Sequence, residues 1–188
     1  MNAAPAVSAP LRLRRRRPAS PQVVEIRPAT AADAHEIHEL ISDHLEEGHL
    51  LPREPGEIAR HAGRFVVACD AGRVVACADL APLSRHVAEV RSLVVGEEAR
   101  SLGVGRRLLD ALLRRATGAG FEKLCAFTHV PGYFVQLGFS LVPHVWLPEK
   151  IQVDCHSCRE FRRCGQYAVM LPLGRSASAC VPLASLHA

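Results

Sequence analysis

The stretch EVRSLVVGEEARSLGVGRRLLDALL, which runs from Glu89 to Leu113, changes its repeat pattern halfway along. Its first part is an apolar run typical of a buried strand, which we predict over residues 87–95. Its last part places leucines three and four residues apart, the spacing of one helix face, and predicts a helix from about Val104. A buried strand followed closely by an amphipathic helix indicates an α/β domain.

The flanking segments continue this alternation. Thr30 and Asp33 form a capping box that starts a helix extending to Leu45. Two apolar runs, RFVVAC and VVACADL, are separated by DAGR and predict a β-hairpin. Further strands are expected at 23–27, 123–127 and 167–173, and short helices at 57–61 and 132–137. The order β-α-α-β-β-β-α-β-α-β predicts a single α/β domain with a mixed β-sheet flanked by helices.

Length and composition favour one domain with two tails. The chain has 188 residues, 48% of them hydrophobic, which we divide into a disordered basic arm (1–22), a domain (23–174) and a tail (175–188). Four of the charges behind the net +4 stand together at residues 14–17, so the domain is nearly neutral and nucleic-acid binding is not indicated. With no membrane-length apolar run and no secretory leader, we expect a cytoplasmic protein without a membrane partner. An organellar transit peptide is the alternative for the arm, although its prolines interrupt any amphipathic helix.

The segment RSLGVG, residues 100–105, stands where the predicted helix begins. A helix N-terminus has unpaired N–H groups and a partial positive charge, and therefore attracts phosphate. Gly103 and Gly105 open the backbone to an anion, while Arg100 and Arg106 add positive charge, so we predict a pyrophosphate site. The chain lacks the Lys-Ser/Thr of a P-loop and the G-x-G-x-x-G of a dinucleotide fold. A helix cap that uses glycine only for close packing is the alternative.

A strand, then R-x-x-G-x-G, then a helix, a strand and YFVQLGF resembles the GNAT acyl-CoA N-acetyltransferase superfamily over residues 23–173. The resemblance implies the GNAT fold and acetyl-CoA as cosubstrate. In that superfamily the glycine turn binds the pyrophosphate of coenzyme A and the preceding strand pairs with its pantetheine arm. The coenzyme-binding residues that the resemblance implies are Leu93, Val94, Val95, Arg100, Ser101, Leu102, Gly103, Val104, Gly105 and Arg106.

Five further segments resemble one branch of the superfamily, the short-form N-acetylglutamate synthases: IRPATAADAHEIHELI, GHLLPRE, CADLAPLSRHVAEVRSLVV, FTHVPGYFVQLGF and LPEKIQVDCHSCREFRRC. The resemblance implies acetyl transfer to the α-amino group of L-glutamate, the first step of arginine biosynthesis. A GNAT enzyme acting on another amino acid, a small amine or a protein N-terminus is one alternative, and a non-catalytic CoA-binding interaction module is another. A homodimer stays open.

Four residues are candidates for the chemistry. Glu89 is the candidate general base for the acceptor amine, and a surface strand residue is the alternative. Tyr133 is the candidate general acid for the leaving thiolate, but Phe134 stands where the family pattern has tyrosine, so packing is the alternative. Arg53 and Arg91 are candidates for the carboxylates of glutamate; solvated charges or internal ion pairs are the alternatives.

Cys155, Cys158 and Cys164 stand close together in DCHSCREFRRC. Three thiols at such spacing favour a soft metal, so we expect a structural zinc site. Such a site needs four ligands, and no fourth ligand is evident from the sequence. Reduced or redox-sensitive thiols in a loop are the alternative.

Overall fold

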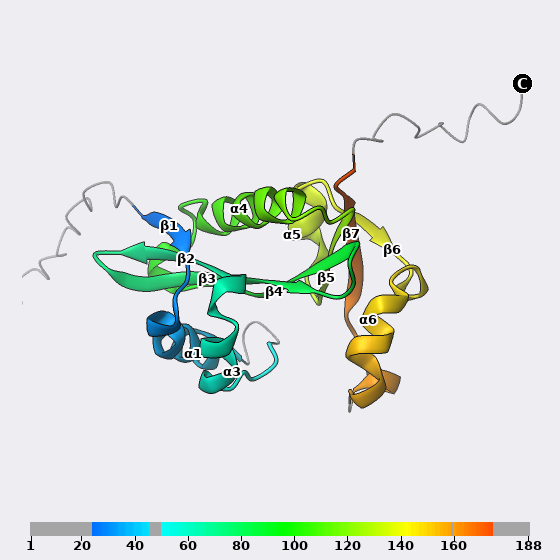
Figure 1. Ribbon diagram of the computed structural model, residues 1–188, viewed down its shortest axis with the longest axis horizontal. Coiled ribbons are helices and arrows are strands. Elements are labelled where there is room, and N and C mark those ends of the chain that lie inside the picture. The colour runs from blue at the N-terminus through cyan, green and yellow to red at the C-terminus, as the bar shows by residue number, and fades with distance from the viewer. Residues whose placement is uncertain (1–23, 46–49, 159, 175–188) are drawn as a thin grey trace, which may run out of the picture.

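The computed structural model of the protein describes residues 24–45, 50–158 and 160–174. The predicted basic arm and the tail beyond residue 174 lie outside the described residues. The described chain forms one seven-stranded sheet in the order β1-β2-β3-β4-β5-β7-β6, with helices on both faces (Figure 1). This mixed, helix-flanked sheet confirms the predicted fold class.

The sequence predicted most of the observed elements. The strands are β1 (Glu25–Pro28), β2 (Phe65–Asp70), β3 (Arg73–Pro82), β4 (Val87–Val95), β5 (Lys123–Thr128), β6 (Ser140–Val142) and β7 (Tyr167–Pro172). The helices are α1 (Ala34–Asp43), α3 (Pro55–Arg60), α4 (Val104–Gly118), α5 (Pro131–Gln136) and α6 (Pro148–Val153). Both β6 and α6 were missed: the three residues of β6 are too few to show an alternation, and α6 buries none of its residues and so has no apolar face to recognise.

The predicted capping box is present between β1 and α1. The backbone N–H of Thr30 donates to Asp33 Oδ2 at 2.7 Å, and the Thr30 hydroxyl donates to the same oxygen at 2.9 Å. Arg27 adds hydrogen bonds of 2.6 and 2.8 Å to both Asp33 oxygens, and its guanidinium holds the pKa of Asp33 well below the usual range. These bonds fix the end of β1 against the start of α1.

Each face of the sheet is buried by its own set of helices. The longest helix, α4, covers one face with fully buried Leu108, Leu109 and Leu112, and α5 adds to this layer (Figure 1). The opposite face is covered by α1 and α3 at one end and by α6 at the other (Figure 1). Burying one leucine side chain stabilises a fold by about 1.5–3 kcal/mol, so these layers hold the sheet firmly. None of the helices in the described ranges is long and apolar enough to cross a bilayer.

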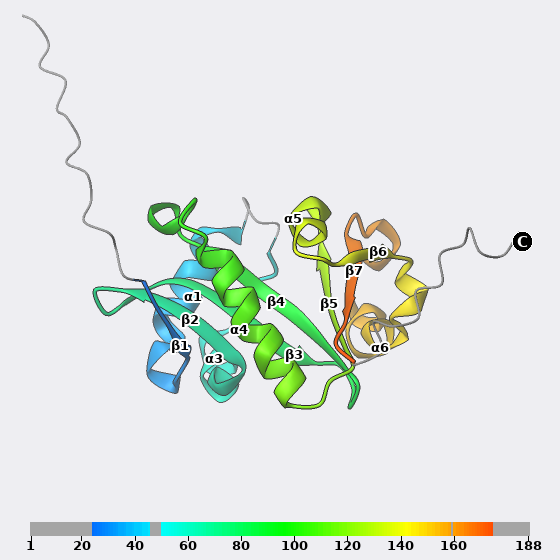
Figure 2. The same ribbon diagram turned by 90° about the horizontal axis from the view of Figure 1, so that it is seen from above.

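The one parallel junction of the sheet lies between β4 and β5. Its register joins Val87 to Lys123, Ala88 to Leu124 and Glu89 to Cys125, after which the strands separate (Figure 2). Because β4 continues to Val95 and β5 to Thr128, the facing edges beyond this junction have no strand partner among the described residues. The backbone N–H and C=O groups on these two facing edges are therefore not hydrogen-bonded to a neighbouring strand.

Candidate functional site

A β-bulge bends β4 where it leaves β5. Between the pairs Cys77↔Val94 and Asp79↔Arg91, β3 advances two residues while β4 advances three, so β4 carries one extra residue. Ser92 lies in this extra stretch with a φ of 46°, in the left-handed region that few non-glycine residues adopt. Bulges re-aim the side chains of a strand and are frequent beside active sites.

The end of β4 presents backbone groups toward β5. Gly96 N–H donates to Val75 O on β3 at 2.9 Å. Because backbone groups alternate along a strand, those of the preceding Val95 point away from β3, and its carbonyl accepts a hydrogen bond of 3.2 Å from Arg100 Nε. Val95 thus offers an edge to which an extended ligand can pair, while the side chain of Val94 is buried in the core.

The loop that follows β4 curves tightly into the N-terminus of α4. Ser101 and Gly103 have φ angles of 63° and 71°, and Gly103 is the N-cap of this 15-residue helix. A left-handed N-cap explains the glycine at 103, since other L-residues pay about 1–2 kcal/mol for that conformation. The side chains of residues 101–103 and of Arg106 are exposed, so solvent and ligands reach the helix N-terminus. This geometry is that of an anion-binding turn.

Tyr133 brings α5 against the start of α4. A Cβ atom added at Gly105 would lie 2.8 Å from Tyr133 Oη, so only glycine permits this approach. The hydroxyl is buried and has no hydrogen-bond partner within the described part of the chain. Burial raises the pKa of Tyr133, and nearby Asp110 raises it further, so the group stays protonated. A buried donor without a partner, beside an open anion turn, fits a site that a polar ligand completes.

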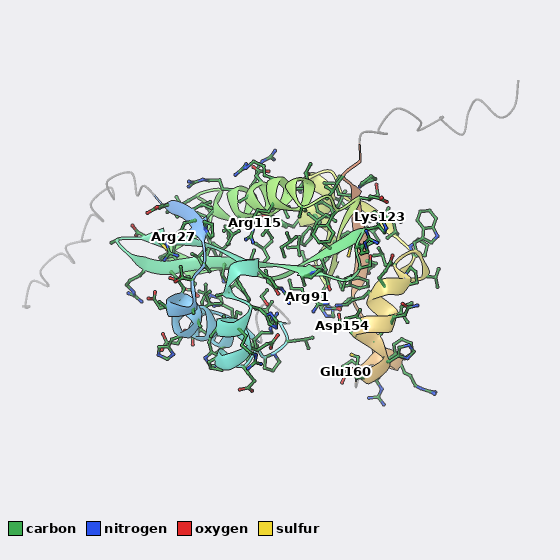
Figure 3. All side chains as sticks on the ribbon, in the orientation of Figure 1. Arg27, Arg91, Arg115, Lys123, Asp154 and Glu160 are labelled. Carbon is green, nitrogen blue, oxygen red and sulfur yellow. The ribbon has the colours of Figure 1, made fainter. Side chains whose placement is uncertain are left out.

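Four charged side chains meet between β4 and α6, and we call them the β4–α6 cluster: Glu89, Arg91, Lys150 and Asp154. Lys150 Nζ lies 2.8 and 2.9 Å from the two carboxylate oxygens of Glu89, whose second oxygen also accepts a 2.6 Å bond from Arg91 Nε. Asp154 accepts from Arg91 and lies 2.9 Å from Lys150. Figure 3 shows Arg91 and Asp154 in the space between β4 and α6.

The charges of this cluster support one another. Glu89 is only 3% exposed, and a buried carboxylate requires cationic partners. Burial opposes the charge of Arg91, but the carboxylates of Glu89 and Asp154 outweigh it and raise the pKa of Arg91. The cluster therefore combines one deeply buried carboxylate with an arginine and a lysine beside the bulge.

Arg53 belongs to a separate ion-pair network. Its guanidinium lies 2.8 Å from Glu57 and 3.4 Å from the fully buried Asp79, which Arg64 also contacts at 3.1 Å. It also approaches the hydroxyl of Ser92, at 3.4 Å, so it reaches the bulge from the α1–α3 side. The internal ion pair that the sequence left as an alternative for Arg53 is thus present, and so is one for Arg91.

The comparisons with known proteins identify the family of the chain. Residues 32–139, more than half of the chain, match the acetyltransferase (GNAT) family. The chain belongs to the GNAT acetyltransferase family. A Chlorobaculum tepidum protein described as an uncharacterized N-acetyltransferase is 31% identical over 79% of this chain and 96% of its own length.

Two of the similar proteins are much longer than this chain. The amino-acid acetyltransferase of Neisseria meningitidis is 31% identical over 71% of this GNAT chain but only 31% of its own length. The N-acetylglutamate synthase of Neisseria gonorrhoeae, solved with coenzyme A and N-acetyl-glutamate, is 28% identical, with a TM-score of 0.72 over 83% of this chain and 36% of that one. The chain thus spans about a third of the length of these relatives.

The expected zinc site is not supported in this GNAT domain. Across residues 24–45, 50–158 and 160–174, no group of three or more histidine, cysteine, aspartate or glutamate side chains could hold a metal ion. Cys155 is half-buried and Cys158 and Cys164 are exposed, all three as free thiols. Zinc ligands must converge on one point at about 2.0–2.3 Å, which these turns do not achieve. Burial raises the pKa of Cys155, in keeping with the alternative of reduced thiols.

Surface shape alone does not mark the GNAT site. A hollow of about 560 Å³ lies between β1 and α4, and another of about 430 Å³ lies on the cysteine-rich segment. Neither is lined by residues of β4 or by the glycine turn. The candidate site is instead indicated by the edge of β4 that has no strand partner among the described residues, the unpartnered Tyr133 hydroxyl and the β4–α6 cluster.

Sequence reasoning missed Lys150 and Asp154. Both lie in LPEKIQVDC, a segment noticed only for its cysteines and its family resemblance. Their spacing of four residues, with opposite charges, was the available signal, because such pairs meet on one side of a helix. No local sequence pattern predicts that they contact Glu89 and Arg91 on β4.

Proposed function

We propose that this GNAT acetyltransferase transfers the acetyl group of acetyl-CoA to the α-amino group of L-glutamate, the cytoplasmic first step of arginine biosynthesis. The observation that carries the proposal is the pair of half-buried cations, Arg91 and Lys150, beside the bulge of β4. Glutamate brings two carboxylates, and cations in a partly desolvated site favour such a ligand over a neutral one. The similarity to a synthase solved with coenzyme A and N-acetyl-glutamate supports the same acceptor.

The coenzyme half of the site uses the backbone. The exposed turn from Arg100 to Arg106 receives the pyrophosphate at the α4 N-terminus, and residues 93–95 pair with the pantetheine arm along the open edge of β4. This arrangement directs the thioester toward the divergence of β4 and β5. The backbone of the turn, with its left-handed φ angles at Ser101 and Gly103, needs no rearrangement for this binding.

The reaction joins the acceptor nitrogen to the acetyl carbonyl carbon and breaks the carbon–sulfur bond. Glu89 accepts the proton that the acceptor ammonium must lose, directly or through a water. Tyr133 donates its proton to the departing thiolate; its buried, unpartnered hydroxyl supports this role. The acceptor nitrogen loses its second proton as the carbon–sulfur bond breaks, and this proton restores the phenol of Tyr133. The products are an amide, a free thiol and one proton held by Glu89.

Acceptor specificity divides between two arginines. Arg91, in the β4–α6 cluster, binds one carboxylate of the acceptor, and its raised pKa keeps it charged for that purpose. Arg53 reaches the other side of the bulge, where its pairs with Glu57 and Asp79 hold it in position for the second carboxylate. The domain over residues 23–174 is the proposed catalytic unit.

An acceptor panel tests the proposal. Thiol release from acetyl-CoA is measured with L-glutamate, L-glutamine, other amino acids and a peptide N-terminus. The kcat/KM for glutamate should exceed that for glutamine by about 100-fold, because the neutral amide cannot form a charge-assisted hydrogen bond with these cations. Arg91→Gln and Arg53→Gln should each raise the KM for glutamate. Arg85→Gln, which changes an exposed arginine in the β3–β4 turn, is the matched control.

The panel also identifies the alternatives. Equal efficiency with glutamate and glutamine would favour a broader amine acetyltransferase. Tight coenzyme A binding with no turnover of any amine would favour a CoA-binding interaction module.

A further inference from the structure

The β4–α6 cluster has an unequal pair of carboxylates. The Glu89 side chain is 4% exposed and lies on a central strand, whereas the Asp154 side chain is 32% exposed and follows the last residue of α6. Both bind the same two cations, Arg91 and Lys150. Asp154 is therefore the carboxylate that solvent, and an incoming anion, can reach.

The cations are better anchored than Asp154. Arg91 extends from β4 and contacts Glu89, and Lys150 contacts both Glu89 oxygens and lies 5.1 Å above the ring of Phe127 on β5. Lys150 and Asp154 both lie in the connection between β6 and β7, and the backbone N–H of Asp154 donates to Lys150 O at 3.0 Å. Asp154 itself follows the last residue of α6, in a turn-like backbone with φ −121° and ψ −40°. Removing Asp154 from the cluster thus leaves both cations in place, held by Glu89.

Charge balance favours an exchange of one carboxylate for another. With Asp154 bound, two carboxylates face two cations in the cluster. If a carboxylate of the acceptor replaces Asp154, the balance is unchanged, and neither Arg91 nor Lys150 loses a carboxylate partner. If the acceptor arrives without displacing Asp154, three carboxylates share two cations, which is unfavourable.

We propose that Asp154 is an internal competitor of the acceptor: it occupies the Arg91–Lys150 site in the free enzyme, and a carboxylate of the acceptor displaces it. This inference rests on the proposed function for the identity of the acceptor. It adds Lys150 as a carboxylate-binding residue and makes Asp154 a specificity filter. An acceptor without a carboxylate cannot replace the Asp154 contact, whereas a dicarboxylic amino acid can. Only the fraction of enzyme molecules in which Asp154 has left the Arg91–Lys150 site can bind the acceptor carboxylate. The apparent affinity for the acceptor is reduced by that fraction.

Glutarate is the probe for this exchange, because it has the two carboxylates of glutamate but no amine to acetylate. Its affinity is measured by calorimetry on the full chain. Asp154→Asn should tighten glutarate binding about tenfold, since the competitor is neutralised without a change of size. Asp154→Glu keeps the competing charge and should stay near wild type. Lys150→Met should weaken binding about tenfold, since one of the two cations is lost.

A matched control separates displacement from general electrostatics. Glu149→Gln makes the same charge change on the same helix, outside the cluster, and should alter glutarate affinity by less than about twofold. Equal tightening by Glu149→Gln and Asp154→Asn would overturn the proposal. So would weaker glutarate binding in a folded Asp154→Asn protein, because Asp154 would then be positioning the cations instead of competing for them.

The two proposals fail separately. If Asp154→Asn tightens glutarate but no variant acetylates glutamate, the displaced-carboxylate site stands and the proposed acceptor is wrong. If glutamate is acetylated while Asp154→Asn leaves both glutarate affinity and the KM for glutamate unchanged, the proposed function stands and the displacement is wrong.

Discussion

The glycine turn follows the end of β4, and the β4–α6 cluster lies where β4 separates from β5, but the two regions are formed by different chemical groups. The turn uses consecutive backbone groups, shaped by the left-handed conformations of Ser101 and Gly103. The cluster uses side chains of β4 and α6 that lie about 60 residues apart in the sequence. Under the proposed function, coenzyme binding depends on backbone conformation, whereas acceptor binding and catalysis depend on individual charges. Substitutions in the two regions should therefore affect different kinetic constants.

The largest effect is expected in the cluster. Glu89→Gln should lower kcat by about 100-fold or more, because the acceptor amine loses its proton acceptor. Acetyl-CoA affinity should stay within about twofold of wild type, because the turn is untouched. Steady-state rates from about pH 6 to about pH 9 and a coenzyme titration provide the measurements. A folded variant with a near-normal rate over this range would make Glu89 a structural residue.

In the turn, a large effect on coenzyme affinity is expected. Gly103→Glu should raise the dissociation constant of acetyl-CoA by about 30-fold or more, because it combines a strained left-handed residue with a negative charge at the helix N-terminus. Gly103→Asn is the control, since asparagine tolerates this conformation and carries no charge. The affinities are measured by calorimetry. Unchanged affinity in the glutamate variant would exclude the turn from the coenzyme site.

The smallest effect is expected beside the turn, at Tyr133, which lies against Gly105. Tyr133→Phe should stabilise the free protein by about 1 kcal/mol, because a buried hydroxyl without a partner is removed. The same variant should gain less stability from coenzyme A than wild type does, because the ligand loses a donor. Thermal unfolding with and without coenzyme A measures both effects. Equal stabilisation of the two proteins by coenzyme A would make the tyrosine a packing residue.

Features encoded locally were predictable from the sequence. The limits of β4, the capping box at Thr30 and the start of α4 follow from apolar runs, short side chains and glycines within a few residues of one another. The position of the turn after β4 followed from the same patterns. These features depend on backbone preferences that act over a single turn or strand.

Features that require the folded chain were not predictable. The approach of Tyr133 to Gly105 joins two helices, and the contact of Lys150 with Glu89 joins the long connection before β7 to a central strand. The cysteines illustrate the reverse case, since their spacing suggested a shared metal and the turns of the segment keep them exposed or half-buried. Spacing limits which residues can meet, but long-range packing decides which of them do.

The divergence of β4 and β5 also affects how the molecule unfolds. Three register pairs are all that join β1–β4 to β5–β7–β6 within the sheet, so the two groups of strands are weakly coupled there. A ligand lying along the free edge of β4 and touching α5 bridges both groups and makes their opening more cooperative. In amide hydrogen exchange, β6 and β7 should open independently in the free protein and together with β1–β4 when coenzyme A is bound. Coenzyme A would then link the two groups of strands while it is bound, and its release would uncouple them again.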